Sequence, residues 1–118
     1  MTYNLFIDDE RDPSDVTWAK TIGEQYMYNV YDWIIARNWN EAENVILTYG
    51  MPSTISFDHD LGKDEKTGYF IAQRICEMVM DGLEEFPANF SFMVHSKNPV
   101  GEGNIRSYMK NFLDNWGK

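Results

Sequence analysis

Three short apolar segments of this chain each end abruptly in a group of acidic, histidine or serine side chains. The segments are residues 3–7, 54–57 and 90–94, and the groups that follow them are Asp8-Asp9, Asp58-His59-Asp60 and His95-Ser96. A short apolar run that stops at a polar loop is typical of a buried β-strand. The sequence therefore predicts a set of buried strands, each of which delivers polar side chains to the loop at its end.

Helical patterns separate these strands. Residues 31–36 add a further strand-like run, and helices are expected over about 38–50, 68–80 and 103–116, while residues 13–28 are ambiguous between a helix and a loose loop. Strands that alternate with helices predict an α/β fold, here a small three-layer sandwich around a mostly parallel four-stranded sheet. The 118 residues are expected to form a single domain.

The carboxyl ends of parallel strands share one rim of the sheet, where open α/β sheets bind their ligands. The three polar groups are therefore expected to meet in one site, although each group alone is also compatible with an ordinary turn. Carboxylates held this close repel one another unless a cation or a shared proton compensates. We expect Asp8, Asp9 and Asp58 to bind a divalent cation. Oxygen ligands favour Mg²⁺ or Mn²⁺, and the two nearby imidazoles also admit Zn²⁺ or Fe²⁺.

The charge and the cysteine content narrow the classes of function. A formal net charge of −9 argues against an extended nucleic-acid surface, but it permits a small phosphorylated ligand held through a metal ion. The single cysteine, Cys76, allows no internal disulfide, and no apolar run is long enough to span a membrane. The N-terminus is unlike a signal peptide. These features predict a cytoplasmic protein, of a bacterial cell or of a virus-infected host cell.

Four segments resemble the cyclic-phosphate processing receiver-like family, a divergent form of the response-regulator receiver fold. They are residues 5–13 (LFIDDERDP), 55–62 (ISFDHDLG), 67–69 (TGY) and 94–101 (VHSKNPVG). The Asp-His-Asp-Leu-Gly and His-Ser-x-Asn-Pro-x-Gly motifs are the specific ones, and the similarity extends over nearly the whole chain. The resemblance implies a reduced receiver (flavodoxin-like) topology and an activity on cyclic phosphates of nucleotides or RNA ends.

The resemblance adds Asn98 to the expected site and places Arg11 beside it. Two departures argue against an ordinary phosphorelay role. The chain ends after the helix that follows the fourth strand, so the fifth strand of a signalling receiver and its lysine have no counterpart, with Lys97 as the available substitute. The chain also adds His59 and His95, which phosphoacceptor signalling does not require.

A phosphoesterase is the first function that these residues suggest. The cation would neutralise the phosphate and activate a water molecule, and the two histidines would act as general base and general acid. A mechanism in which the histidines act without metal also stays open. The expected catalytic residues are His59, His95, Asp58, Asp60 and Ser96. The expected substrate-binding residues are Arg11, Lys97, Asn98 and Gly101, the last at the start of a helix whose N-terminus favours an anion.

A non-catalytic binding module is the alternative. In that case the receiver-like pocket would bind a nucleotide or phosphate, or the domain would dock a protein partner through exposed aromatic side chains. Several aromatic residues are concentrated in the first third of the chain: Trp18, Tyr26, Tyr28, Tyr31 and Trp39. Most of them are expected to cover the core, but an exposed aromatic patch would mark an interface.

Overall fold

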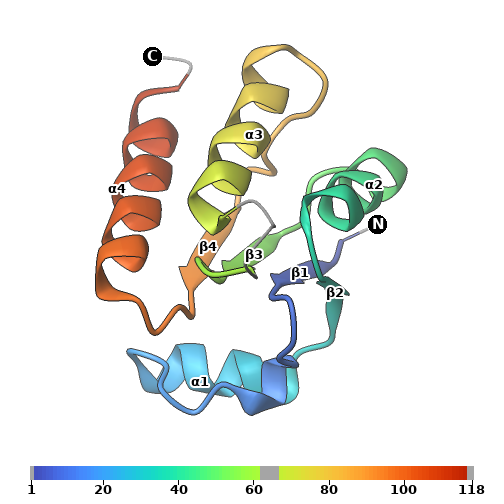
Figure 1. Cartoon of the computed structure of the whole chain (residues 1–118). Helices are drawn as coiled ribbons and strands as arrows, with labels where there is room; N and C mark the ends of the chain where they lie inside the picture. The colour runs from blue at the N-terminus through green and yellow to red at the C-terminus, as the bar shows by residue number, and fades with distance from the viewer. Residues whose placement is uncertain (1, 62–66, 117–118) are drawn as a thin grey trace.

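The sheet consists of four parallel strands, which confirms the predicted α/β class. A computed structural model describes residues 2–61 and 67–116 of the chain. The strands are β1 (Asn4–Ile7), β2 (Trp33–Ala36), β3 (Thr54–Phe57) and β4 (Ser91–Val94), in the spatial order β2-β1-β3-β4 (Figure 1). Each neighbouring pair is parallel. The carboxyl ends of all four strands therefore lie at one rim of the sheet.

Helices cover both faces of this sheet. They are the short 3₁₀ helix η1 (Pro13–Asp15) and the α-helices α1 (Ile22–Val30), α2 (Trp39–Tyr49), α3 (Gly68–Met80) and α4 (Pro99–Asn115). Helix α1 lies on one face, and α2, α3 and α4 lie on the other (Figure 1). The chain steps in opposite directions from β1 to β2 and from β2 to β3, and right-handed crossovers then place α1 and α2 on opposite faces. The predicted three-layer sandwich with receiver topology is confirmed.

Side-chain caps fix where the α-helices begin. Thr21, Asn38, Thr67 and Asn98 each accept a hydrogen bond from a backbone N–H in the first turn of the helix that follows. The cap at Asn98 and the proline after it start α4 at Pro99, whereas the apolar pattern alone suggested a start near residue 103.

Two other segments are refined by the structure. The ambiguous stretch 13–28 contains η1 and most of α1, and β2 begins at Trp33 instead of residue 31. None of the helices within the described ranges is long and apolar enough to cross a membrane.

The strands alternate their side chains between two apolar clusters. Leu5 and Ile7 of β1 pack with Phe57 of β3 against the face covered by α2, α3 and α4. Phe6 points the opposite way and packs with Tyr28 of α1. Because the period of a strand is two residues, the residue that follows each strand continues this alternation at the rim.

The strand register brings the rim residues into line. Ile7 is paired with Phe57, and Phe57 is paired with Val94. The ladder continues one step further, since the Asp58 N–H donates to the Ile7 carbonyl at 3.0 Å and the His95 N–H donates to the Phe57 carbonyl at 2.9 Å. Asp8, Asp58 and His95 therefore sit side by side on three adjacent strands.

A glycine at the start of α3 lets this helix approach the end of β3. A Cβ atom at Gly68 would overlap the backbone carbonyl of Asp58. We predict that Gly68→Ala lowers the free energy of unfolding by about 2 kcal/mol or more, because backbone has to shift. Gly103→Ala in α4 is the matched control, since a Cβ there meets nothing within 4 Å and alanine favours a helix by about 0.5–1 kcal/mol. Urea denaturation of both variants tests this, and equal stability of the two would contradict it.

Candidate functional site

Asp8, Asp58 and His95 form the centre of the rim. All three residues are buried, and one ligand atom from each lies within 4.8 Å of the others. The residues come from three strand ends that are separated by up to 87 positions in the chain, so the strand register alone brings them together. The structure thus places three of the predicted site residues in one cluster at the expected rim.

Asp8 is a buried carboxylate that is held in the ionised form. Its Oδ1 accepts hydrogen bonds from the backbone N–H groups of Glu10 at 2.9 Å and Arg11 at 2.8 Å, and its Oδ2 lies 3.0 Å from His95 Nε2. Burial by itself raises the pKa of Asp8, but the hydrogen bonds from His95 and from the two backbone groups outweigh it and lower the pKa to about 2. Asp8 is therefore a fixed negative charge across the physiological pH range.

His95 stands at the centre of a buried hydrogen-bond chain. Its ring stacks on Phe6 with the centroids 4.3 Å apart, and its Nδ1 lies 2.7 Å from Ser56 Oγ. Ser56 Oγ in turn lies 2.5 Å from the Tyr28 hydroxyl. An ionised Asp8 can only accept, so Nε2 carries a proton, and in the neutral imidazole Nδ1 then accepts from the Ser56 hydroxyl. Burial lowers the pKa of His95, which favours this neutral tautomer.

This arrangement leaves His95 no unused ring nitrogen. Its side chain has 0% exposure, and a bond from Nε2 to a metal ion would require the loss of the proton shared with Asp8. The geometry therefore favours a role for His95 in orienting Asp8, which differs from the general acid that the sequence suggested. Ser56 was not singled out from the sequence, and Tyr28 was named only among the aromatic residues of the first third of the chain, not as part of the site. A serine between two apolar residues of a buried strand was the available signal for Ser56.

Asp58 is the second buried carboxylate and is less well compensated. Its Oδ1 accepts from the backbone N–H of His59 at 2.9 Å, and its Oδ2 has the Arg11 guanidinium 3.8 Å away. Burial and the charge of Asp8 raise the pKa of Asp58 to about 7, against the opposing effect of Arg11. Two buried carboxylates of which one lacks a full counter-charge fit a hard divalent cation with oxygen ligands.

Asp9 lies next to this pair at the edge of the cluster. It is half-buried and does not belong to the group of close ligand atoms. Burial and the neighbouring charge of Asp8 raise the pKa of Asp9. The role of Asp9 as a metal ligand therefore stays a prediction, because its carboxylate lies outside the group of close ligand atoms.

His59 and Asp60 form a separate pair closer to solvent. His59 Nδ1 lies 3.0 Å from Asp60 Oδ1, and the side-chain exposures are 18% and 68%. The His59 ring lies against Gly101 in the first turn of α4, where a Cβ would overlap the ring. Gly101 thus makes room for the imidazole, a reason for this glycine that the sequence did not suggest.

The loop from β4 to α4 is organised by its own side chains. Ser96 Oγ accepts from the Asn98 N–H at 3.0 Å, and Asn98 Oδ1 accepts from the Gly101 N–H at 3.1 Å. These bonds account for the spacing of the polar residues within the turn, and they leave the Ser96 hydroxyl proton and the Asn98 amide N–H groups as donors. Gly62, the last residue of the Asp-His-Asp-Leu-Gly motif, lies outside the described residues.

Arg37 and Trp18 connect neighbouring segments to the rim, and neither was predicted to belong to the site. The Arg37 guanidinium donates to the carbonyls of Arg11 at 2.7 Å and Asp8 at 3.3 Å. The Trp18 ring N–H donates to the His95 carbonyl at 2.7 Å. The two side chains therefore fix the backbone of the loop after β1 and of the end of β4.

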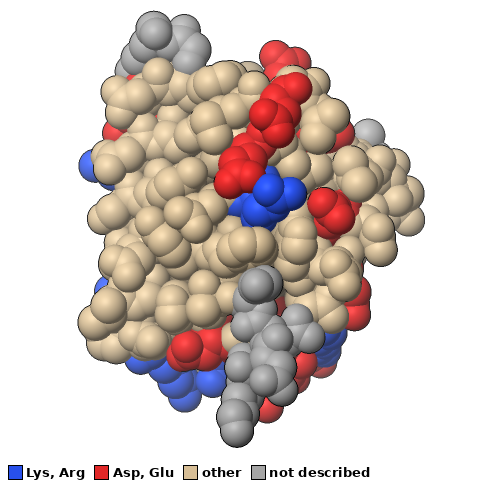
Figure 2. Space-filling view, turned by 45° about the horizontal axis from the view of Figure 1, so that its top comes forward, with Lys and Arg blue, Asp and Glu red and all other residues tan. Residues whose placement is uncertain are grey.

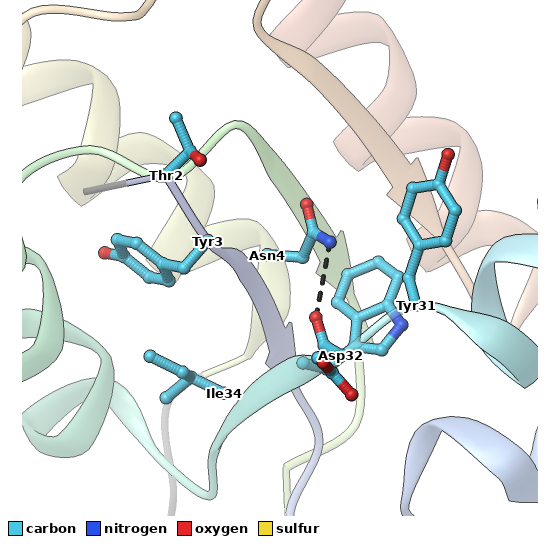
Figure 3. A pocket seen from close by; sticks show the side chains of 7 residues that line it. Thr2, Tyr3, Asn4, Tyr31, Asp32 and Ile34 are labelled. Carbon is cyan, nitrogen blue, oxygen red and sulfur yellow. Dashed lines mark hydrogen bonds between the residues drawn. The ribbon is translucent and has the colours of Figure 1, made fainter.

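A cavity of about 420 Å³ lies far from this rim. It is lined by Thr2, Tyr3, Asn4, Tyr31, Asp32, Trp33 and Ile34, which lie at the amino ends of β1 and β2, and Figure 3 shows the hydrogen bond between Asn4 and the Asp32 carbonyl that crosses it. None of the predicted site residues lines this cavity. The convergence of charged groups, rather than the depth of a hollow, therefore identifies the candidate site.

The fold and the rim define a receiver-like domain, that is, a parallel α/β sheet with buried acids at the carboxyl ends of its strands. The family model described as "Cyclic-phosphate processing Receiver domain" matches residues 3–111, and the chain belongs to this family. No curated protein matches the chain.

Among solved structures, the chain is similar in fold to one titled as the trimeric coiled coil of yeast Spc42 fused to another structure. The TM-score is 0.54 at 23% sequence identity, and the match covers 90% of this chain and 59% of that chain. The chain thus spans less than two thirds of that protein, and the likeness concerns the fold alone.

The raised pKa of Asp58 predicts how pH affects stability. The pKa of Asp58 is about 7 in the folded protein against 3.8 for an ordinary aspartate. Ionised Asp58 therefore destabilises the metal-free fold above pH 7, and this penalty shrinks as the pH falls from 7 toward 4. We expect Asp58→Asn to stabilise the metal-free protein at pH 8 by on the order of 2 kcal/mol, with a smaller gain at pH 5.

Thermal unfolding in the presence of a chelator measures this effect. Asp32→Asn at the opposite rim is the matched control, because Asp32 is exposed and its neutralisation should change the Tm little. A destabilised Asp58→Asn variant at pH 8 would show that Asp58 is not an uncompensated charge.

Proposed function

We propose that the protein is a phosphoesterase that hydrolyses cyclic phosphates of nucleotides or RNA ends with the help of a divalent cation. The observation that carries the proposal is the pair of buried carboxylates, Asp8 and Asp58, of which the second lacks a full counter-charge. Membership in a family named for cyclic-phosphate processing supports the substrate class. The reaction would break one of the two ester bonds of the cyclic phosphate and add the elements of water to give a monoester.

The cation would be held by Asp8 and Asp58, with Asp9 beside them. Mg²⁺ or Mn²⁺ suits these oxygen ligands best, and Zn²⁺ or Fe²⁺ is the alternative. Such an ion would lower the pKa of a bound water molecule and neutralise charge on the phosphate. His95 would orient Asp8 through Nε2, and Ser56 and Tyr28 would maintain the tautomer in which it does so.

His59 is the proposed proton carrier. Asp60 accepts from Nδ1 when that nitrogen is protonated, which directs the lone pair of the imidazole to Nε2. A general base needs such a lone pair and an orienting partner, and His59 has both. Ser96, Asn98, Lys97 and Arg11 are the proposed donors to the phosphoryl oxygens, since phosphoryl transfer depends chiefly on positioning and charge stabilisation.

A non-catalytic docking module is the second candidate, and one observation favours it. The outer side of α1 exposes Ile22 at 90%, Tyr26 at 56% and Val30 at 55%. These residues recur at every fourth position, so they form one apolar stripe along the helix. Exposed stripes of this kind mark interaction surfaces. On this account the rim would only bind a phosphorylated ligand, and the stripe would contact a protein partner.

A screen of 2′,3′- and 3′,5′-cyclic nucleotides with Mg²⁺, Mn²⁺ or Zn²⁺ separates the two candidates. The phosphoesterase account predicts a monoester product that accumulates with time and is lost with a chelator, and Asp58→Asn provides the matched inactive protein. Saturable binding of the nucleotides without product, under all three metals, would favour the docking module.

Replacement of His59 tests the proton carrier. We expect His59→Ala to lower kcat by on the order of 100-fold or more, because a general base contributes that much, while the affinity for the metal stays close to wild type. His59→Gln keeps the volume next to Gly101 and should be equally slow. Full turnover by either variant would remove His59 from the mechanism.

A further inference from the structure

The Arg11 guanidinium faces both buried carboxylates at once. Its Nη1 lies 3.5 Å from Asp8 Oδ2 and 3.8 Å from Asp58 Oδ2. Neither contact is a short charge-assisted hydrogen bond, which would be about 2.8 Å long. The Arg11 side chain also keeps 28% of its surface exposed. Arg11 is therefore a loosely held counter-cation of the carboxylate pair, placed where a metal ion would also be attracted.

Trp18 gives the same guanidinium a second contact. The Arg11 Cζ lies 5.1 Å from the centroid of the Trp18 ring, and Lys97 Nζ lies 4.2 Å from it. Both distances are within the range of cation–π interactions. The ring itself is anchored by its hydrogen bond to the His95 carbonyl. Two cations of a chain with a net charge of −9 thus meet at one aromatic ring beside the acids.

The backbone of Arg11 is held by short hydrogen bonds, whereas its side chain makes only longer contacts with the two carboxylates. The Arg11 N–H donates to Asp8 Oδ1 at 2.8 Å, and the Arg11 carbonyl accepts from the Arg37 guanidinium at 2.7 Å. Arg37 also pairs with Asp12 at 2.9 Å, so both terminal nitrogens of its guanidinium have partners. Arg11 can therefore change its side-chain partner over a stationary backbone, whereas Arg37 serves to hold the loop.

The formal net charge of −9 makes a local cation important for binding an anion. Figure 2 shows one face of the molecule, on which acidic side chains gather in a stripe beside a smaller basic patch. An anionic ligand is repelled by such a charge distribution unless positive groups lie next to its site. Arg11 and Lys97 at the Trp18 ring provide such groups.

We propose that Arg11 is an exchangeable cation that couples metal binding to phosphate binding. The proposal rests on the proposed function, because it requires a divalent cation at Asp8 and Asp58. Without metal, Arg11 partly neutralises the two carboxylates. When a divalent cation takes over that task, the guanidinium is released to bind a phosphate together with Lys97 at the Trp18 ring. Arg11 thus weakens the binding of the metal ion alone and strengthens its binding when phosphate is present. By linkage, the metal ion and the phosphate each raise the affinity for the other by the same factor.

The test measures Mg²⁺ affinity by titration calorimetry with and without inorganic phosphate. Arg11→Gln removes the positive charge, and Arg11→Lys keeps a positive charge but lacks the planar guanidinium that binds phosphate through two N–H groups. Arg74→Gln is the matched control, because Arg74 pairs with Glu77 on α3 and its loss changes the net charge equally. We expect Arg11→Gln to bind Mg²⁺ about 5-fold or more tightly than Arg74→Gln in the absence of phosphate.

The effect of phosphate on the Mg²⁺ affinity distinguishes an exchange of Arg11 between carboxylates and phosphate from simple repulsion of the metal ion by its charge. Wild type and Arg74→Gln should bind Mg²⁺ about 5-fold or more tightly when phosphate is present, Arg11→Lys should retain part of this gain, and Arg11→Gln should lose it. Equal Mg²⁺ affinity of Arg11→Gln and Arg74→Gln, or an undiminished phosphate effect in Arg11→Gln, would overturn the proposal.

Two further outcomes separate this inference from the proposed function. Mg²⁺ binding to Arg11→Gln but not to wild type would support Arg11 as the competing cation while contradicting the use of this metal by the natural protein. Failure of Mg²⁺, Mn²⁺ and Zn²⁺ alike to bind either protein would overturn both proposals. Trp18→Leu adds a further check, since loss of the ring should weaken the phosphate effect on Mg²⁺ affinity.

Discussion

The charge of Asp8, buried to 0% exposure, is the constraint on which the rest of the rim depends. A carboxylate removed from water needs several hydrogen-bond donors, or it becomes protonated. Asp8 obtains them from two backbone N–H groups of its own loop and from His95. Because His95 presents a proton to Asp8 on Nε2, its other ring nitrogen, Nδ1, needs a donor. The Ser56 hydroxyl supplies it and is itself in contact with the Tyr28 hydroxyl. Through this hydrogen-bond chain, the buried charge of Asp8 is connected to β4, β3 and α1.

Asp58 is the carboxylate that the fold compensates less well. Burial and the charge of Asp8 raise the pKa of Asp58 to about 7, so it ionises in the metal-free fold only at neutral pH and above. The fold compensates one acid with internal donors and leaves the other to Arg11, which is only loosely held. In the proposed function, a divalent ion would supply the missing positive charge, and Arg11 would then become available for an anion. Both proposals rest on the unequal compensation of the two acids.

The sequence predicted the parts of the molecule that depend on local pattern. The helix over residues 68–80 and the cap at Asn38 were predicted correctly, because apolar spacing and capping residues are encoded within a few positions. Helix α1 stayed ambiguous, since residues such as Ile22 face solvent and blur its apolar side. Ser56 and Trp18 were missed for another reason: their partners lie 39 and 77 positions away, so only the assembled sheet reveals them.

The central claim is that Asp8 and Asp58 together hold a divalent cation. Crystals soaked in Mn²⁺ and recorded at the manganese absorption edge test it most directly, because anomalous density locates the ion without assumptions about activity. The account predicts a peak between the two carboxylates, with oxygen ligands at roughly 2.1–2.3 Å and the Arg11 side chain withdrawn from Asp58. A rim without a peak, with Arg11 still facing both carboxylates at saturating Mn²⁺, would contradict it.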